Sequence, residues 1–187
     1  MNRTKRGFTI VELLIVIVVV AILAGLSAAA YRGITQRANN ASRIATAEQW
    51  VHLLKMYIAA TGSIPPSIDA LAVGSQRLCL GTGFPVGGGG VPRCQSVKGT
   101  DANSPAESDS AQLLSELKTV GELPSNKPVP TEPGLVGPWL SKPVSSGMVR
   151  VTVAVDGVFA PGEQCGGGFK SGWTDSRVST CNKTIVF

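Results

Sequence analysis

Residues 7–30 read GFTIVELLIVIVVVAILAGLSAAA, an apolar run that contains a single ionisable side chain, Glu12. An α-helix rises about 1.5 Å per residue, so roughly 20 apolar residues cross the hydrocarbon core of a bilayer. The run is therefore long enough to span a membrane. A carboxylate at that depth costs roughly 3 kcal/mol on insertion scales, so Glu12 needs a partner that offsets this cost.

The net charge of +5 belongs to the N-terminal part of the chain. Arg3, Lys5 and Arg6 stand directly before the apolar run, whereas residues 61–187 hold ten basic and ten acidic side chains. Positive residues before a membrane span favour an N-terminus in the cytoplasm, so we expect the residues after Ala30 to lie outside it. The balanced charge of the later part gives no support to nucleic acid as a partner.

The composition divides the chain into four segments. Residues 1–7 form a basic leader, 8–30 the membrane-spanning half of a long helix, 31–61 its amphipathic half, and 62–187 an extracytoplasmic domain. In the second half of the helix, apolar residues recur at intervals of three and four, which is the spacing of one buried helix face. These residues are Ile44, Ala47, Val51, Leu54 and Ile58.

The end of this helix and the domain after it are predicted from local signals. Gly62 is a typical C-terminal stop, and Pro65-Pro66 prevents the helix from continuing. Residues 63–147 are rich in Pro, Gly and Ser and are predicted to be mostly loop. One short helix is expected at 108–120, with Ser108 or Asp109 as its N-cap.

Strands are predicted near the C-terminus. Residues 148–155, MVRVTVAV, alternate Val with Arg, Thr and Ala, which predicts a strand buried on one face. Asp156-Gly157 is a moderate hairpin signal, so residues 158–160 could begin the partner strand. Residues 179–187 are predicted to form the last strand of the sheet.

Two ordinary explanations of the N-terminus leave features unexplained. A secretory signal peptide would account for the basic start and for small residues at 28–30 as a cleavage site, but the run is long and Glu12 is out of place. A plain membrane anchor would account for the length and the flanking charges, but it leaves Glu12 without a partner.

The stretch KRGFTIVELLIVIVVVAILAG, residues 5–25, closely resembles the N-terminus of type IV pilins and the related pseudopilins. In that family, a membrane peptidase cuts after the Gly of the leader, and the new N-terminal Phe is N-methylated. The resemblance implies cleavage between Gly7 and Phe8, methylation of Phe8, and an assembly role for the charge of Glu12.

The resemblance also explains the buried carboxylate. Cleavage removes the charges of the leader and creates a new one, the α-amine of Phe8, one helical turn from Glu12. Both charges need a partner in a poor solvent. In the family's filament, the glutamate of an incoming subunit is thought to meet the amine of a subunit already in place, a head-to-tail contact that propagates.

What the resemblance implies about fold and function can be stated as expectations. The fold is α+β, a long N-terminal helix packed on a small antiparallel sheet with loop-rich insertions. The chain would be a structural subunit of a type IV pilus-like surface filament that serves adhesion or twitching motility. A pseudopilin of a secretion or DNA-uptake system, and a membrane-tethered binding module that does not polymerise, remain alternatives.

The same resemblance implies partners and a location. The partners would be other copies of the chain, the prepilin peptidase and methyltransferase, the pilus assembly platform, and the lipid bilayer before assembly. The precursor would cross the cytoplasmic membrane once, and the assembled subunit would lie at the cell surface. No enzymatic activity is implied.

Four cysteines permit three disulfide connectivities. We favour the pairs that are local in the sequence, Cys79–Cys94 and Cys165–Cys181, each of which closes a loop of about 15 residues and contributes roughly 3 kcal/mol in the chain-entropy model. The second pair resembles the disulfide-bounded C-terminal loop of many pilins. A zinc site is the rival interpretation, but the sequence has neither a Cys-x-x-Cys motif nor a nearby His.

Other candidate sites are weaker. The single histidine, His52, lies in the predicted helix, and no Ser or Cys nucleophile has a second histidine to activate it, so no catalytic residue is predicted. Asp101, Asn103, Glu107 and Asp109 could bind Ca²⁺, but a solvated acidic loop explains them as well. No cofactor and no metal are expected.

Overall fold

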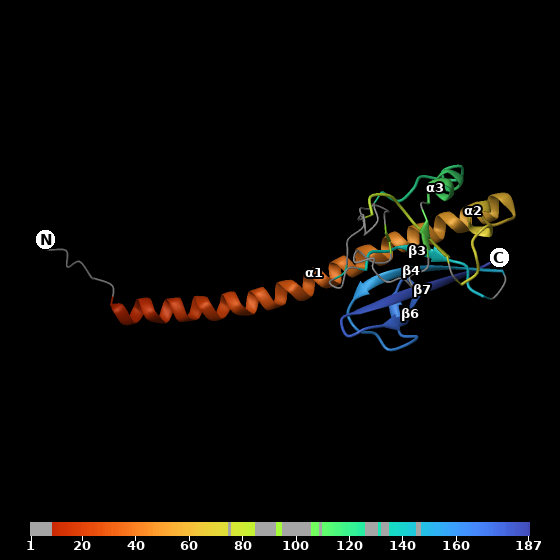
Figure 1. The fold of residues 1–187 in the computed structure, drawn as a ribbon. Helices are drawn as coiled ribbons and strands as arrows, with labels where there is room; N and C mark the ends of the chain where they lie inside the picture. The colour runs from red at the N-terminus through yellow and green to blue at the C-terminus, as the bar shows by residue number, and fades with distance from the viewer. Residues whose placement is uncertain are drawn as a thin grey trace. The chain divides into compact units, whose positions relative to one another are not determined.

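The computed structural model describes residues 9–74, 76–84, 93–94, 106–108, 110–125, 131, 135–144 and 147–187. The chain divides into two compact units, Met1–Ala38 and Asn39–Phe187. Helix α1, Ile10–Thr61, contributes residues to both (Figure 1). An α+β architecture results, as the sequence predicts, with a long N-terminal helix followed by a sheet.

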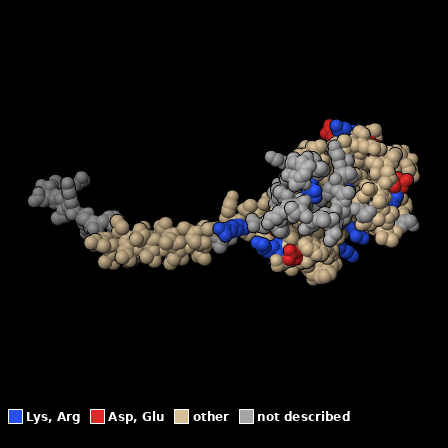
Figure 2. Space-filling view, viewed as in Figure 1, with Lys and Arg blue, Asp and Glu red and all other residues tan. Residues whose placement is uncertain are grey.

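In the first unit, the apolar side chains of α1 are exposed. Every large apolar residue from Ile10 to Leu26 is between 47% and 86% exposed. The helix is long and apolar enough to cross a membrane. In Figure 2, the visible face of this apolar run shows no Lys or Arg; these side chains appear only farther along the helix.

In the second unit, α1 is amphipathic and its buried face starts at Arg43 and Ile44. The stripe predicted from the sequence is confirmed, since Ile44, Ala47, Val51 and Leu54 are buried and Ile58 packs against the same cluster. The helix ends where the local signals predict. Gly62 has a φ of +73°, a backbone conformation that glycine adopts at little cost, and its amide donates to the carbonyl of Ile58 (2.8 Å).

The sheet has seven strands in the order β2-β1-β3-β4-β7-β6-β5. Their bounds are β1 Gln76–Cys79, β2 Ala106–Ser108, β3 Trp139–Ser141, β4 Met148–Asp156, β5 Gln164–Gly166, β6 Phe169–Thr174 and β7 Val178–Val186. All neighbouring strands are antiparallel except β1 and β2, which pair in parallel at one edge. The longest strands, β4 and β7, pair along their whole length at the centre.

Two hydrophobic clusters lie on opposite faces of this sheet. The main cluster joins α1 to Val149, Val151, Val153 and Val155 of β4. A smaller cluster lies on the other face and contains Cys79, Phe84, Cys94, Val136, Trp139, Ala154 and Val178. Because this second cluster covers Ala154, the C-terminal half of β4 is buried on both faces, whereas the sequence predicted burial on one face only.

Three sequence predictions are corrected. Residues 158–160 do not form the partner strand of β4, which pairs with β7 instead. The short helix α3 spans Ala111–Leu117 with Ser110 as its N-cap residue, and Ser108 belongs to β2. The stretch predicted to be mostly loop also contains α2, Pro66–Asp69, and the strands β1, β2 and β3.

Candidate functional site

The first turn of α1 is closed by a reciprocal contact between Thr9 and Glu12. The Thr9 amide and the Thr9 hydroxyl donate to Oε2 of Glu12, at 2.9 and 2.8 Å, and the Glu12 amide donates to Oγ1 of Thr9 at 3.2 Å. This arrangement is a capping box, in which the N-cap residue and the third helical residue satisfy each other's backbone amides. The first turn of the helix therefore supplies two of the hydrogen bonds that the Glu12 carboxylate can accept.

The spacing Thr-x-x-Glu before an apolar run is a recognised sequence signature of this cap. Sequence reasoning considered only the Phe8 amine as a partner and missed the cap. The contact occupies one carboxylate oxygen, and Oε1 of Glu12 accepts no hydrogen bond from the described residues. Gly7 and Phe8, the expected cleavage and methylation residues, lie outside the described residues.

All four cysteines are paired, as Cys79–Cys94 and Cys165–Cys181. These are the sequence-local pairs. The first disulfide lies in the smaller cluster between β1 and the segment at Cys94. The second joins the edge strand β5 to the central strand β7, where Cys181 is buried in the main cluster.

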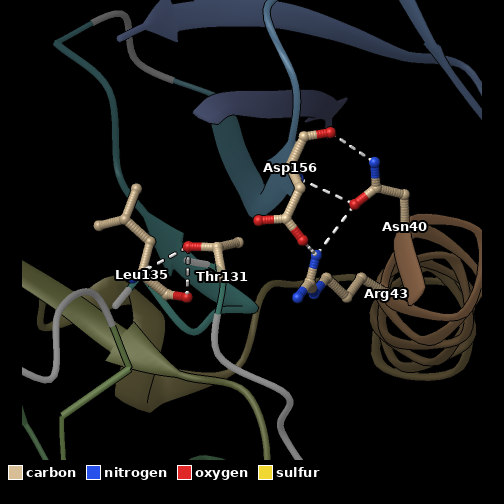
Figure 3. Close-up of polar contacts among 5 residues, drawn as sticks. All are labelled: Asn40, Arg43, Thr131, Leu135 and Asp156. Atoms are coloured by element: carbon tan, nitrogen blue, oxygen red, sulfur yellow. Dashed lines mark hydrogen bonds and ion pairs between the residues drawn. The ribbon is translucent and has the colours of Figure 1, made fainter. Parts of the chain in front are cut away.

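A buried polar network fastens α1 to β4 within the second unit. Arg43 donates to Oδ2 of Asp156 (2.6 Å) and to Oδ1 of Asn40 (2.9 Å), and the side chains of Arg43 and Asp156 are only 6% and 14% exposed. Figure 3 shows these contacts and, separately, the hydrogen bonds between Thr131 and Leu135. No local pattern in the sequence indicated this network.

His52 lines a groove between α1 and residues 121–125, and its side chain is exposed. The groove is also lined by Glu48, Met56, Glu122 and Leu123. Among the described residues, no group of three His, Cys, Asp or Glu side chains is arranged to hold a metal ion. Of the calcium candidates, Asp101, Asn103 and Asp109 lie outside the described residues, and Glu107 is part of β2.

Comparisons with known proteins agree with the N-terminal features. A family model described as the prokaryotic N-terminal methylation motif matches residues 2–28. A fimbrial protein of Neisseria meningitidis serogroup A / serotype 4A is 36% identical over 76 residues, which are 41% of this chain and 45% of that protein. A type IV major pilin protein PilE1 of Neisseria gonorrhoeae is 36% identical over 75 residues, 40% of this chain and 46% of that protein.

The chain therefore spans less than half the length of these curated relatives. No solved structure matched it significantly. The methylation motif and the similarity to a neisserial fimbrial protein and a neisserial major pilin support a relationship to the type IV pilin family, and a long N-terminal helix followed by a largely antiparallel sheet is consistent with the pilin fold.

Proposed function

We propose that the chain is a structural subunit of a type IV pilus-like surface filament. The observation that carries the proposal is the uncovered apolar surface of α1 with a carboxylate, Glu12, in its first turn. Apolar surface of this extent requires lipid or neighbouring protein around it. A bilayer would cover it before assembly, and the same segment of other copies would cover it in a filament.

The charge of Glu12 gives assembly its direction. Cleavage between Gly7 and Phe8 creates an α-amine, and methylation would leave it positively charged. The capping box holds Oε2 of Glu12 against Thr9, so that Oε1 remains for the amine of a neighbouring subunit. Because each subunit brings one amine and one carboxylate, the contact is head-to-tail and extends into a helical polymer.

The proposal includes the partners that this route requires. The prepilin peptidase and methyltransferase would act on the precursor while it crosses the cytoplasmic membrane with its N-terminus inside. The assembly platform would then move the mature subunit from lipid into the filament, and the disulfide-bonded second unit would lie outside the cell. Adhesion and twitching motility are functions that such a filament would serve, and we assign no catalytic role.

Two measurements on sheared surface material test this proposal. Electron microscopy with an antibody against the second unit should show labelled long filaments. The intact mass of the purified subunit should equal that of a chain starting at Phe8 plus one methyl group. Short periplasmic assemblies would favour a secretion pseudopilin, and protein found only in membranes would favour a tethered binding module. An uncut Met1 or a mature start at Tyr31 would overturn the processing step.

A further inference from the structure

Beyond the smaller hydrophobic cluster, the sheet face away from α1 is polar where Arg150 of β4, Lys170 of β6 and Thr184 of β7 are exposed. Strand registers place Lys170, Asn182 and Thr152 side by side in one row, and Arg150 beside Thr184 in the next. These positions alternate with the valines of β4 that pack on α1, so they lie on the face away from the helix. Arg150, Lys170 and Thr184 are exposed, and Asn182 is half-buried.

The amide of Asn182 is held in one orientation on this face. The Thr152 hydroxyl donates to Oδ1 of Asn182 at 2.8 Å, so the amide oxygen is already used. Nδ2 is directed over Gly172 on the adjacent strand, and a Cβ at position 172 would collide with it. Nδ2 has no acceptor among the described residues. Glycine at position 172 thus leaves a fixed N–H donor accessible above the strand.

The charge on this face is of one sign. The outward positions of β4, β6 and β7 that surround Asn182 include two cations, Arg150 and Lys170, and no carboxylate. Neither cation forms an ion pair with a described residue. Residues 61–187 as a whole carry equal numbers of acidic and basic side chains, so the excess of positive charge around Asn182 is local. A surface that presents only N–H donors and positive charge is complementary to anions.

We propose that Arg150, Lys170 and Asn182 form a binding surface for a carboxylate-bearing polysaccharide. Strand spacing and rise place the Cα atoms of Arg150 and Lys170 roughly 10–12 Å apart, which suits successive charges of a linear polymer. The Thr184 hydroxyl lies between them and can bond a sugar hydroxyl. Trp173 directly follows Gly172, where the pairing of β6 with β7 shifts register, and its side chain is 57% exposed.

The same features disfavour a nucleic acid strand as the occupant. Single-stranded nucleic acids are bound through successive aromatic platforms on which neighbouring bases stack. On β4, β6 and β7, Trp173 is the one exposed aromatic residue, because Phe169 is fully buried. The proposal does not depend on polymerisation, since every residue it uses belongs to the second unit of one subunit.

The experiment uses the full chain in non-ionic detergent and measures retention on immobilised polygalacturonate, with dextran as the neutral polymer. We expect retention on polygalacturonate alone, with release by moderate salt. Arg150→Glu, Lys170→Glu and Asn182→Asp should each weaken binding by roughly tenfold or more, because each replaces a donor with a negative charge. Gly172→Ala should weaken it as well, since it displaces the Asn182 amide.

Lys118→Glu is the matched control, since Lys118 is exposed at the end of α3, away from the sheet, and forms no ion pair with a described residue. Arg150→Glu, Lys170→Glu and Lys118→Glu should each keep the thermal unfolding midpoint of the wild type, which separates lost binding from lost folding. The proposal is overturned if Lys118→Glu weakens binding equally, if dextran is retained as well as polygalacturonate, or if poly(dT) is retained and polygalacturonate is not.

Discussion

The side-chain amide of Asn40 forms two hydrogen bonds with the backbone of Asp156, which lies 116 residues away in the sequence. Nδ2 of Asn40 donates to the Asp156 carbonyl (2.6 Å), and the Asp156 amide donates to Oδ1 of Asn40 (2.9 Å). The side chain of a helical residue thus satisfies both backbone groups of the residue that ends β4. Arg43 adds the counter-charge for the Asp156 carboxylate, so one turn of α1 fixes the end of the central strand (Figure 3).

Asp156→Ala should destabilise the second unit by about 3 kcal/mol, because it removes the buried carboxylate that pairs with the buried Arg43. The measurement is equilibrium denaturation of the detergent-solubilised chain, followed by the fluorescence of the buried Trp50 and Trp139. Asn40→Ala should cost less, about 1–3 kcal/mol, since it removes two hydrogen bonds to the backbone of Asp156 but no charge.

The ion pair between Lys142 and Asp69 provides the control for this prediction. Its atoms are 2.9 Å apart, but the side chain of Asp69 is 70% exposed. Lys142→Ala should therefore cost less than about 1 kcal/mol. Equal losses for Lys142→Ala and Asp156→Ala would show that burial does not decide the strength of the Arg43–Asp156 contact.

Replacing Cys165 and Cys181 together with Ala should lower the free energy of unfolding by roughly 3 kcal/mol, the chain-entropy contribution of a loop of this length. The edge strand β5 should become the first site of proteolysis, because it has three residues and pairs with β6 alone. Limited proteolysis followed by mass spectrometry identifies the first cut. Non-reducing peptide mapping that joined Cys79 or Cys94 to a later cysteine would contradict the pairing.

The long helix and the two central strands could be predicted because their signals are local. Apolar residues spaced three and four apart predicted the buried face of α1. Gly62 and Pro65 predicted where the helix ends, and alternating valines predicted β4. The strands β1 and β3 could not be predicted in this way. They have only four and three residues, and each is fixed by partners far along the chain, as in the pairing of Arg77 with Ser141.

The wrong hairpin at Asp156-Gly157 has the same origin. The dipeptide permits a tight turn, but the Gly157 amide donates to the carbonyl of Arg177, which brings β7 beside β4. Asn40 and Arg43 similarly read as ordinary polar residues of a helix surface. Their roles depend on Asp156, and nothing within one helical turn of either residue indicates that partner.

Thr9→Ala should open the first turn of α1, because it removes the hydroxyl that caps Glu12 and leaves the Glu12 amide without its acceptor. Loss of an N-cap costs about 1 kcal/mol in water. Amide hydrogen exchange measured by NMR in detergent micelles should therefore speed up at Glu12. Thr9→Ser keeps the hydroxyl and should restore slow exchange, and fast exchange in both variants would count against the cap.

Glu12→Gln separates the two roles of the Glu12 side chain. Glutamine can still accept from Thr9, as it does in other capping boxes, but it carries no charge for the Phe8 amine. Membrane insertion should not suffer, because a neutral side chain is easier to place in lipid than a carboxylate. Cleavage between Gly7 and Phe8 should continue, since that junction is unchanged. Filament yield should fall to a small fraction of the wild-type value.

Glu12→Leu removes the helix cap as well as the charge. Comparing it with Glu12→Gln therefore shows whether assembly requires the charge or only the cap. Deleting one partner of a buried ion pair costs about 3–5 kcal/mol, and both variants should lose that amount at each subunit contact. The measurement compares mature protein in membranes with sheared filaments for wild type, Glu12→Gln and Glu12→Leu. If Glu12→Gln assembles normally and Glu12→Leu does not, the carboxylate acts only as a helix cap. If both assemble at the wild-type yield, Glu12 is not the assembly contact, and the apolar run of α1 is a membrane anchor alone.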